Sequence, residues 1–489
     1  MAPTQAGPSV DDIRKEVDDR GIEFFFAQFV DMYSRPSAKL IPAAHLDDLV
    51  NDGAGFAGFA AGEIGQVPAD PDIAAMPDLR SFTPVPWEPT VARFACDITV
   101  EGEEWPYDPR TILRRVVESA REKGFDFRFG LELEYFLVEQ MPDGSIRVED
   151  DRDTLEKPCY DLLGLTRHYD FLTTVSKYVN ELGWGNYAND HEDANGQFEQ
   201  NFVFADALTS CDRGIFFRYM VHTLAEKLGE SEGRRIVATF MPKPFSHLTG
   251  NGAHFHMSLW DGDTNLFLDE KDSRHGLGLS ETAYQFIGGL AKHARAYSAI
   301  TAPTVNSYKR LKLGSTTSGA TWSPVWISYG YNNRTQMLRI PAPGRIEDRT
   351  VDGSCNPYLA AAAVLASGLD GIANSLDAGE PNSENLYASS YEALTARGLR
   401  SLPANLLEAA AELEQDDVLR EALGRTREHE EYVDYYLRVK RDEVTVLHRP
   451  QTRDLLLRDL NPPDAKSGNH LAAGLLFIPK SLLIPALRG

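Results

Sequence analysis

The chain has 489 residues, of which 42% are hydrophobic and 25% charged, the composition of an ordinary globular protein long enough for two or more domains. Its formal net charge of −24 at pH 7 argues against a nucleic-acid or anionic-membrane surface, because phosphates would be repelled. A local cationic pocket that binds phosphate is still compatible with that charge.

The cysteine and targeting patterns predict a cytoplasmic protein. The four cysteines lie far apart without a CxxC pair, so neither a disulfide framework nor a zinc site is expected. Residues 1–10 lack the basic and apolar segments of a secretory signal. The most apolar run, residues 471–487, is broken by Pro479, Lys480 and Pro485, whereas a membrane-spanning helix needs about 20 unbroken apolar residues.

The first hundred residues are predicted to form a small mixed α+β unit. A short polar helix is expected over residues 11–20, a strand over residues 22–31 and a second helix over residues 43–50. Residues 53–62 form a loop of small residues that suits close approach to a ligand or a neighbouring subunit. A proline-rich passage then leads to a strand over residues 91–100.

A domain boundary is predicted just before Asp108, so that residues 1–107 and 108–446 form separate domains. Asp108 and Pro109 have the pattern of a helix N-cap followed by proline in the first turn. That helix carries an apolar stripe and ends at Gly124. Beyond it, strands and helices alternate to about residue 375, and the sequence is then helical to the end of the second domain.

Residues 251–260 contain an alternating pattern of polar and apolar side chains. As a strand, they place His254, His256 and Ser258 on one face and apolar side chains on the other. Two imidazoles and a hydroxyl suit a wall that faces a ligand, and the preceding Gly250 lets the backbone approach that ligand closely. A strand with two ordinary histidines beside a turn explains this stretch equally well.

Carboxylates recur on several predicted strands. Residues 127–136 alternate, so Glu132 and Glu134 are neighbours on the face opposite four apolar side chains. The two carboxylates repel each other unless solvent or a cation intervenes, and a solvated sheet face is the simpler alternative. Glu199 begins another strand, and Glu192 lies in the loop before it.

Glu347 lies between Arg345 and Arg349 at a period of two, which places all three side chains on one face. Such a row is either a surface ion-pair ladder of little energetic value or a clamp for an anionic substrate beside a metal. Several strands that each contribute an inward Glu or His would form an oxygen-rich cation site, which suits Mg²⁺ or Mn²⁺ better than zinc.

Further arginines follow along the chain, at Arg310, Arg334 and Arg339. A metal site surrounded by arginines is typical of phosphoryl transfer, since charge on the transferring oxygens must be neutralised. The sequence contains no Walker-type GxxxxGK[ST] motif and no GxGxxG after a convincing strand, so the nucleotide site must be of another kind.

Taken together, these motifs resemble the glutamine synthetase family, from about Asp11 to about Val446. The matching pieces, in family order, are Gly130-Leu-Glu132-Leu-Glu134, Glu192 with Gly196-Gln-Phe-Glu199, Lys243-Pro-Phe, Gly250-Asn-Gly-Ala-His254-Phe-His256-Met-Ser258, Asn306-Ser-Tyr-Lys-Arg310, Asn333-Arg334, Arg339-Ile-Pro, Arg345-Ile-Glu347-Asp-Arg349 and Asn356-Pro-Tyr. Each motif is weak alone, but the complete ordered set leaves little room for chance.

The resemblance implies an α+β protein with an N-terminal β-grasp domain and a C-terminal catalytic domain, in which helices flank a curved antiparallel sheet. It implies ring-shaped homo-oligomers, usually dodecamers of two stacked hexamers, with active sites between neighbouring subunits. Such enzymes use ATP and two or more Mg²⁺ or Mn²⁺ ions to phosphorylate the γ-carboxylate of L-glutamate. An amine then attacks the γ-glutamyl phosphate and gives an amide and phosphate.

The motif positions imply the site residues. One divalent ion would be held by Glu134, Glu192 and Glu199, and the second by Glu132, His254 and Glu347. Glutamate would contact Gly250, Arg310 and Arg349. ATP would contact His256, Ser258, Arg339, Arg345 and Phe204. Arg334 would stabilise the transferring phosphoryl group, and with Glu192 and Arg310 it forms the implied catalytic set.

Two segments depart from the family members that use ammonia. Those enzymes have an aspartate in the N-terminal loop of the adjacent subunit and a glutamate on a flap, and these acids are thought to bind ammonium. The corresponding residues 55–60 and 315–324 contain no acid here, and they carry Phe59 and Trp322 instead. Apolar side chains favour an alkyl group by about 0.8 kcal/mol for each buried methylene.

We therefore expect a ligase that prefers methylamine, or a similar small amine such as ethylamine. Within the family, the chain is most similar to the γ-glutamylmethylamide synthetases, which share both segments. Tyr160, Asp190 or Glu192 would deprotonate or orient the amine. Phe59 and Trp322 would complete this amine pocket.

Several alternatives remain open. The nearest is an ordinary glutamine synthetase whose ammonium-binding acids come from elsewhere in the fold. A more distant alternative is ligation of glutamate to a polyamine, aniline or ethanolamine. An apolar flap disfavours the polyamine, because a second ammonium would need acidic partners. A catalytically inactive member is disfavoured because the metal and phosphate ligands are complete.

One further residue and the C-terminal segment also differ from the family. Thr249 replaces an asparagine that contacts glutamate, and its hydroxyl would substitute only in part. Residues 447–489 form an atypical C-terminal tail that does not resemble the usual family ending.

Overall fold

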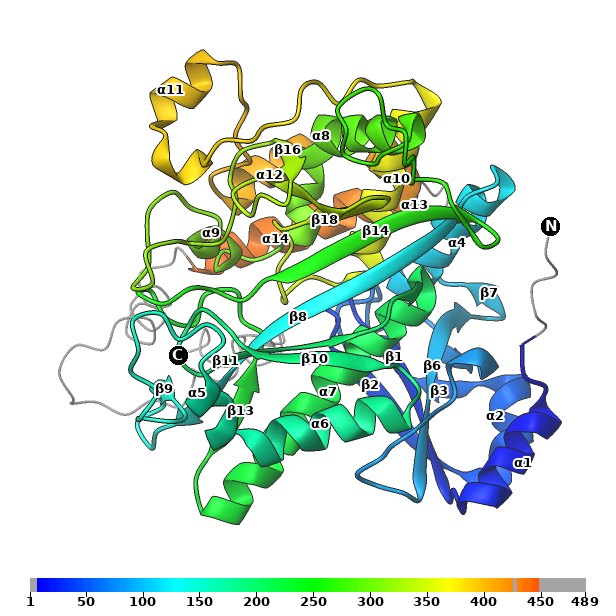
Figure 1. Ribbon diagram of the computed structural model, residues 1–489. Helices are drawn as coiled ribbons and strands as arrows, with labels where there is room; N and C mark the ends of the chain where they lie inside the picture. The colour runs from blue at the N-terminus through cyan, green and yellow to red at the C-terminus, as the bar shows by residue number, and fades with distance from the viewer. Residues whose placement is uncertain (1–6, 425–428, 448–489) are drawn as a thin grey trace.

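A computed structural model describes residues 7–424 and 429–447, in which helices flank two β-sheets (Figure 1). The expected α+β class is confirmed. Among the helices of these residues, none is both long and apolar enough to span a membrane. The tail predicted over residues 447–489 lies, from residue 448 onward, outside the described residues.

The smaller sheet is built by the N-terminal residues and has the order β2-β1-β6-β4-β3, with β5 and β7 paired to β6. β1 and β6 are parallel, and the other pairs are antiparallel. The strands are β1 Phe24–Val30, β2 Pro36–Pro42, β3 Ala54–Phe56, β4 Ile73–Pro77, β5 Thr83–Pro84, β6 Val91–Val100 and β7 Glu103–Glu104. Figure 1 shows α1 (Val10–Arg20) and α2 (Leu46–Asp52) beside this sheet.

Most N-terminal elements agree with their predicted positions, and the segment 53–62 does not. It was expected to be a loop, but it contains the edge strand β3 and the short helix α3 (Gly58–Ala61). The difference is tertiary in origin, because β4 supplies the partner that turns residues 54–56 into a strand. A sequence rich in small residues cannot reveal that partner.

The larger sheet has the order β10-β11-β8-β14-β18-β17-β16, with β9, β12, β13 and β15 attached to β8 and β14. Its strands are β8 Asp126–Gln140, β9 Ile146–Val148, β10 Asn186–His191, β11 Gln197–Phe202, β12 Ala205–Asp206, β13 Ile236–Thr239, β14 Ala253–Asp261, β15 Thr264–Asn265, β16 Tyr329–Tyr331, β17 Leu338–Ala342 and β18 Arg345–Asp348. The sheet is antiparallel, as expected, except for the parallel pair β16–β17. Residues 332–337 connect these two strands and lead the chain back, so that β17 runs in the same direction as β16. The connection begins with Asn332, whose φ is 45°.

The long strands β8 and β14 lie side by side through the middle of the molecule (Figure 1). Their predicted alternation is confirmed, since Phe129 and Phe255 are buried with ring centroids 4.6 Å apart on the apolar face. On the other face, the antiparallel register places Glu132 directly opposite His254. The period of two therefore directs apolar side chains to the helices and polar ones to the opposite side.

Helices cover the apolar surfaces and form the rest of the core (Figure 1). They are α4 Pro109–Glu122, α5 Leu162–Arg167, α6 Tyr169–Glu181, α7 Ala207–Glu232, α8 Glu281–Thr301, α9 Ser307–Arg310, α10 Pro357–Ala373, α11 Tyr391–Ala396, α12 Leu406–Glu414, α13 Asp417–Gly424 and α14 Tyr432–Leu447, with the 3₁₀ turns η1 Ala43–His45, η2 Leu79–Ser81 and η3 Leu386–Ala388. α10 packs on α8 at such close range that a Cβ at Gly289 would lie 2.1 Å from the Ser367 carbonyl oxygen. Only glycine permits that approach.

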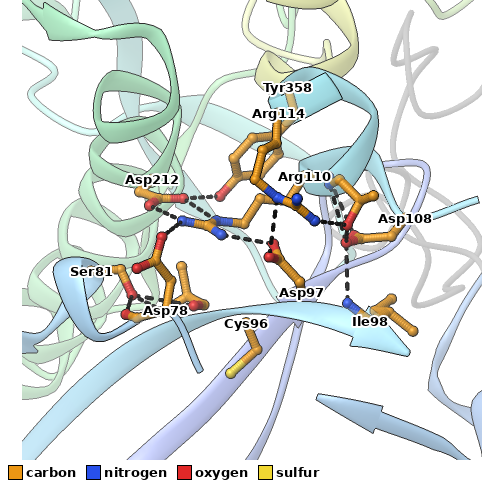
Figure 2. Close-up of polar contacts among 12 residues, drawn as sticks. Asp78, Ser81, Cys96, Asp97, Ile98, Asp108, Arg110, Arg114, Asp212 and Tyr358 are labelled. Atoms are coloured by element: carbon orange, nitrogen blue, oxygen red, sulfur yellow. Dashed lines mark hydrogen bonds and ion pairs between the residues drawn. The ribbon is translucent and has the colours of Figure 1, made fainter. Parts of the chain in front are cut away.

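Arg110 joins the smaller sheet to α7, a helix that packs on the larger sheet (Figure 2). Its side chain is 3% exposed, and it donates two hydrogen bonds of 3.0 Å to the carboxylate of Asp212 on α7. It also donates to Asp97 on β6 at 2.7 Å and to Asp78 before η2 at 2.9 Å. One guanidinium thus compensates three carboxylates from distant segments.

The start of α4 sets this arginine in place. As predicted, Asp108 is the N-cap, and its side chain accepts hydrogen bonds from the Arg110 and Thr111 amides. Asp108 also accepts a 3.1 Å hydrogen bond from the Ile98 amide of β6, so the same cap attaches the helix to the smaller sheet (Figure 2).

His293 on α8 joins two other helical segments. Its ring nitrogens lie 2.5 Å from Asp416 Oδ2 and 3.0 Å from Asp370 Oδ2, and Lys292 also contacts Asp370. Burial alone would lower the pKa of His293, but the hydrogen bonds with Asp416 and Asp370 outweigh it and raise the pKa above its ordinary value. This contribution to stability is complete below the unfolded-state pKa of about 6.5, and it is lost as pH rises through the higher folded-state pKa.

His293→Gln is expected to lower the unfolding free energy by about 2 kcal/mol at pH 6 and by less at pH 9, because the charged hydrogen bonds exist only at the lower pH. Urea midpoints at the two pH values measure the effect. His45→Gln is the matched control, because the exposed His45 pairs with Asp48 at 2.8 Å and should change stability by less than about 0.5 kcal/mol. Equal losses for His293→Gln at both pH values would contradict this expectation.

Candidate active site

The polar face of the larger sheet collects carboxylates and histidines from four strands and one loop. Their ligand atoms form three groups in which all atoms lie within 4.8 Å of one another. The groups are Glu134, Glu192 and Glu199; Glu132, Glu199 and His254; and Glu132, His256 and Glu347. The first is the set assigned to one ion from the sequence. The set assigned to the second ion is also assembled, with His254 Nδ1 3.5 Å from Glu132 Oε2 and 3.8 Å from Glu347 Oε1.

Strand register explains this convergence. Glu199 lies opposite Glu134, Glu132 lies opposite His254, and His256 lies opposite Glu347 in adjacent antiparallel pairs. Because partners in such pairs point to the same side, each pairing adds one ligand to the same face.

Two of the assembled carboxylates resist ionisation. Burial, followed by repulsion from Glu134, raises the pKa of Glu192 well above its usual range. Burial, followed by repulsion from Glu132, likewise raises the pKa of Glu199. Burial opposes ionisation of Glu132 as well, but the His256 charge and hydrogen bonds with the two histidines hold its pKa well below the usual range. Crowded oxygens that resist ionisation without a cation fit a hard divalent ion.

Glu347 is fully buried, so the surface-ladder interpretation of residues 345–349 is wrong. Its carboxylate accepts hydrogen bonds from Arg349 Nη1 at 2.5 Å and Arg339 Nη1 at 2.8 Å. The second partner is therefore Arg339 on the neighbouring strand β17, whereas Arg345 is exposed. Despite its burial, Glu347 has a pKa lowered to about 2, chiefly by the Arg349 charge. The cross-strand pairing with β17, and not the spacing along β18, thus determines the second partner of Glu347.

Two amides that sequence analysis missed orient the carboxylates. Gln197 is fully buried, and its Nε2 donates to Glu134 Oε2 at 2.9 Å and to the Gly250 carbonyl at 3.2 Å. Asn201 donates to Glu199 Oε1 at 2.9 Å. Both lie on β11 at a period of two from Glu199, and that spacing was the signal available in the sequence.

The residues assigned to glutamate lie together beside Glu134. Arg310 Nη1 and Nη2 donate to the carbonyls of Thr350 and Arg349, each at 3.0 Å, so α9 supports the segment after β18. A Cβ at Gly250 would lie 2.2 Å from the Pro242 carbonyl oxygen, which explains why glycine occupies this position. The Thr249 hydroxyl donates to Asp193 at 2.5 Å, so it is already engaged.

The residues assigned to ATP line the other end of β14. His256 Nε2 lies 2.9 Å from Glu132 Oε1, and Ser258 Oγ accepts a hydrogen bond from Trp260 Nε1 at 2.8 Å. Phe204 is 49% exposed, and its ring centroid lies 6.3 Å from that of Trp260. An exposed aromatic ring beside polar phosphate ligands suits a nucleotide base.

The residues assigned to the amine come from separate segments. Partial burial, followed by the charges of Cys159 and Glu192, raises the pKa of the Tyr160 phenol to about 12, and the Arg334 charge opposes that rise. Arg334 is exposed in the connection between β16 and β17. Burial, with repulsion from Glu132, raises the pKa of Asp190.

The remaining aromatic residues of the predicted amine pocket lie on two further segments. Trp322 is 36% exposed on the segment before β16, and Phe59 is 57% exposed on α3 beside the smaller sheet. Tyr160 and Trp322 have φ angles of 63° and 53°, which are unusual for residues other than glycine and recur at functional sites.

Comparison with known proteins supplies the family. Residues 106–455 match the model of the glutamine synthetase catalytic domain. The chain belongs to the glutamine synthetase family. It is 45% identical over 444 residues to the glutamate–methylamine ligase of Methyloversatilis universalis, covering 91% of this chain and 96% of that protein. It is 43% identical over 427 residues to the glutamine synthetase of Rhizobium meliloti, covering 87% and 93%.

A solved structure agrees with this assignment. The chain matches a complex of GmaS with ADP with a TM-score of 0.81 and 45% sequence identity, covering 91% of this chain and 98% of that one. The structure without ligand of the same name gives a TM-score of 0.79 at 43% identity. Members of the glutamine synthetase family use ATP and divalent metal ions, and the ligand groups on the larger sheet are compatible with that chemistry.

Proposed function

We propose that this member of the glutamine synthetase family is a glutamate–methylamine ligase. ATP transfers its γ-phosphoryl group to the γ-carboxylate of L-glutamate, and methylamine then displaces phosphate from the γ-glutamyl phosphate. The products are γ-glutamylmethylamide, ADP and phosphate. The observation that carries the choice of amine is the segment 315–324, which contains no acid and presents the partly exposed Trp322.

Each half of the reaction has its own residues. Mg²⁺ or Mn²⁺ would be held by Glu134, Glu192 and Glu199 and by Glu132, His254 and Glu347, and would neutralise the charge of polyphosphate and glutamate. Arg310, Arg349 and Gly250 bind glutamate. His256, Ser258, Phe204, Arg339 and Arg345 bind ATP, and Arg334 stabilises the transferring phosphoryl group. Tyr160 orients the amine, and Asp190 or Glu192 accepts its proton.

The site is completed by a neighbouring subunit. Phe59 lies on α3 beside the smaller sheet, whereas the other site residues surround the larger sheet. An assembly of two stacked six-membered rings, as in the family, brings residues 53–62 of one subunit to the site of the next. We propose that the active enzyme is a dodecamer in the cytoplasm, and size-exclusion chromatography with light scattering measures its mass.

Phosphate release with glutamate, ATP and Mg²⁺ tests the amine across methylamine, ethylamine and ammonia. Burial of one methyl group contributes about 0.8 kcal/mol, so methylamine should exceed ammonia in kcat/KM by at least about fourfold. A higher kcat/KM for ammonia would replace this proposal with an ordinary glutamine synthetase. The 43% identity to a glutamine synthetase supports that alternative.

Trp322→Glu restores a carboxylate to the segment 315–324. It is expected to lower the methylamine-to-ammonia ratio of kcat/KM by about tenfold or more, because a carboxylate stabilises the small ammonium ion. Trp322→Phe is the matched control, since it keeps an apolar ring and should leave the ratio nearly unchanged. If both variants shift the ratio equally, the shift comes from lost indole volume rather than from charge.

A further inference from the structure

Asp193 connects three segments that are distant in the sequence. It lies in the turn between β10 and β11, directly after Glu192. Its Oδ2 accepts a hydrogen bond of 2.5 Å from the Thr249 hydroxyl, 56 residues away, and another from the Ser318 hydroxyl, 125 residues away. Thr249 and Ser318 are 5% and 9% exposed, so these hydrogen bonds are largely shielded from water.

A third hydroxyl closes the cluster. Thr316 Oγ1 lies 3.3 Å from Thr249 Oγ1 and 3.1 Å from Ser318 Oγ, and it donates to the Ala320 carbonyl. The cluster therefore attaches the middle of the segment 315–324 to the catalytic turn. We call this segment the flap.

The same residue also contacts a proposed metal ligand. The Asp193 amide donates to Glu192 Oε2 at 3.1 Å, while its side chain holds the flap. A displacement of Asp193 would thus disturb the Glu192 carboxylate and the flap together. The backbone contact needs no side chain and survives any substitution other than proline.

We propose that Asp193 is a positioning residue that holds the flap closed over the amine side of the site, with Thr249 and Ser318 as its partners. The inference rests on the proposed function only in that a γ-glutamyl phosphate forms. With the flap closed, an amine reaches the acyl carbon and water is excluded. With the flap open, water attacks the same carbon, and the intermediate returns to glutamate and phosphate.

The cluster also explains the departures from the family pattern. The flap contains no acid, and residue 249 is a threonine rather than the asparagine that the family resemblance implies. The Thr249 hydroxyl donates its proton to Asp193, which leaves only its acceptor lone pairs for the substrate. Thr249 and the hydroxyls of the flap form one hydrogen-bonded arrangement. In it, an acid on the turn between β10 and β11 holds a flap that contains no acid of its own.

The test measures the ratio of phosphate released to amide formed, together with the amine KM. Asp193→Ala should raise that ratio from about one to several and raise the amine KM by about tenfold or more, since hydrogen bonds to a carboxylate are strong. Asp193→Asn keeps an acceptor oxygen without the charge and should shift both quantities by much less than Asp193→Ala. Ser318→Ala and Thr249→Val should each show part of the effect of Asp193→Ala. Thr249→Ser keeps the hydroxyl and should behave like the wild type.

Two controls make the result decisive. Ser315→Ala removes an exposed hydroxyl of the flap outside the cluster and should leave the ratio unchanged. Hydroxylamine as the acceptor captures the acyl phosphate whatever the natural amine is. A wild-type enzyme that prefers ammonia would therefore overturn the proposed function, and the test of Asp193 would still be valid. An unchanged ratio in Asp193→Ala, or an equal effect in Asp193→Asn, would overturn the role of Asp193.

Discussion

Glu199→Gln is expected to reduce kcat by about 10³-fold or more and at the same time to stabilise the metal-free protein. A bound metal contributes several kcal/mol to phosphoryl transfer, and each 1.36 kcal/mol corresponds to a factor of ten. Glu199 is a proposed ligand of the first ion, and it also groups with Glu132 and His254 of the second site, so its loss should weaken the first site directly.

The gain in stability has an electrostatic cause. Glu199 is buried and repelled by Glu132, Glu192 and Glu134, and its raised pKa reflects that cost. A neutral amide of the same shape removes the repulsion, and it should raise the unfolding free energy in EDTA by about 1 kcal/mol. The site therefore sacrifices stability to bind a cation.

Calorimetric titration with Mn²⁺ and thermal unfolding with and without EDTA measure the two effects separately. Wild-type protein should gain stability from the metal, and Glu199→Gln should gain little. Glu122→Gln, at the exposed end of α4, is the matched control and should change neither quantity. An unchanged Mn²⁺ affinity in Glu199→Gln would rule out Glu199 as a ligand.

Arg110→Met is expected to lower the unfolding free energy by about 3–5 kcal/mol. Removal of the guanidinium leaves the carboxylates of Asp78, Asp97 and Asp212 close together and without their shared partner (Figure 2). An uncompensated buried charge is costly, whereas the intact pair contributes less. Arg110→Lys keeps the charge but loses the two-point contact with Asp212, so an intermediate loss is expected.

The chain offers a close control for this prediction. Arg80 contacts the same Asp78 at 3.2 Å, but its side chain is 59% exposed. Arg80→Met should therefore cost less than about 1 kcal/mol. Urea unfolding of the variants measures the difference, and equal losses for Arg110→Met and Arg80→Met would contradict the role of burial.

Patterns carried by nearby residues were predictable from the sequence. Alternation along β8 and β14 assigns Glu132, Glu134 and His254 to a polar face, because side chains two residues apart share a side of any strand. The Asp108 cap before α4 is equally local. The ordered motifs extended these local inferences to the family, which the catalytic-domain match confirms.

Contacts between distant segments were decided only by the tertiary structure. Spacing paired Glu347 with Arg345, but the register between β17 and β18 pairs it with Arg339. Asp193 and Arg110 each join segments that lie far apart in the sequence, and a lone acid or arginine does not specify its partner. Local periodicity thus determined which side chains face the site. Strand register and long-range packing decided which of them touch, because both depend on residues far away along the chain.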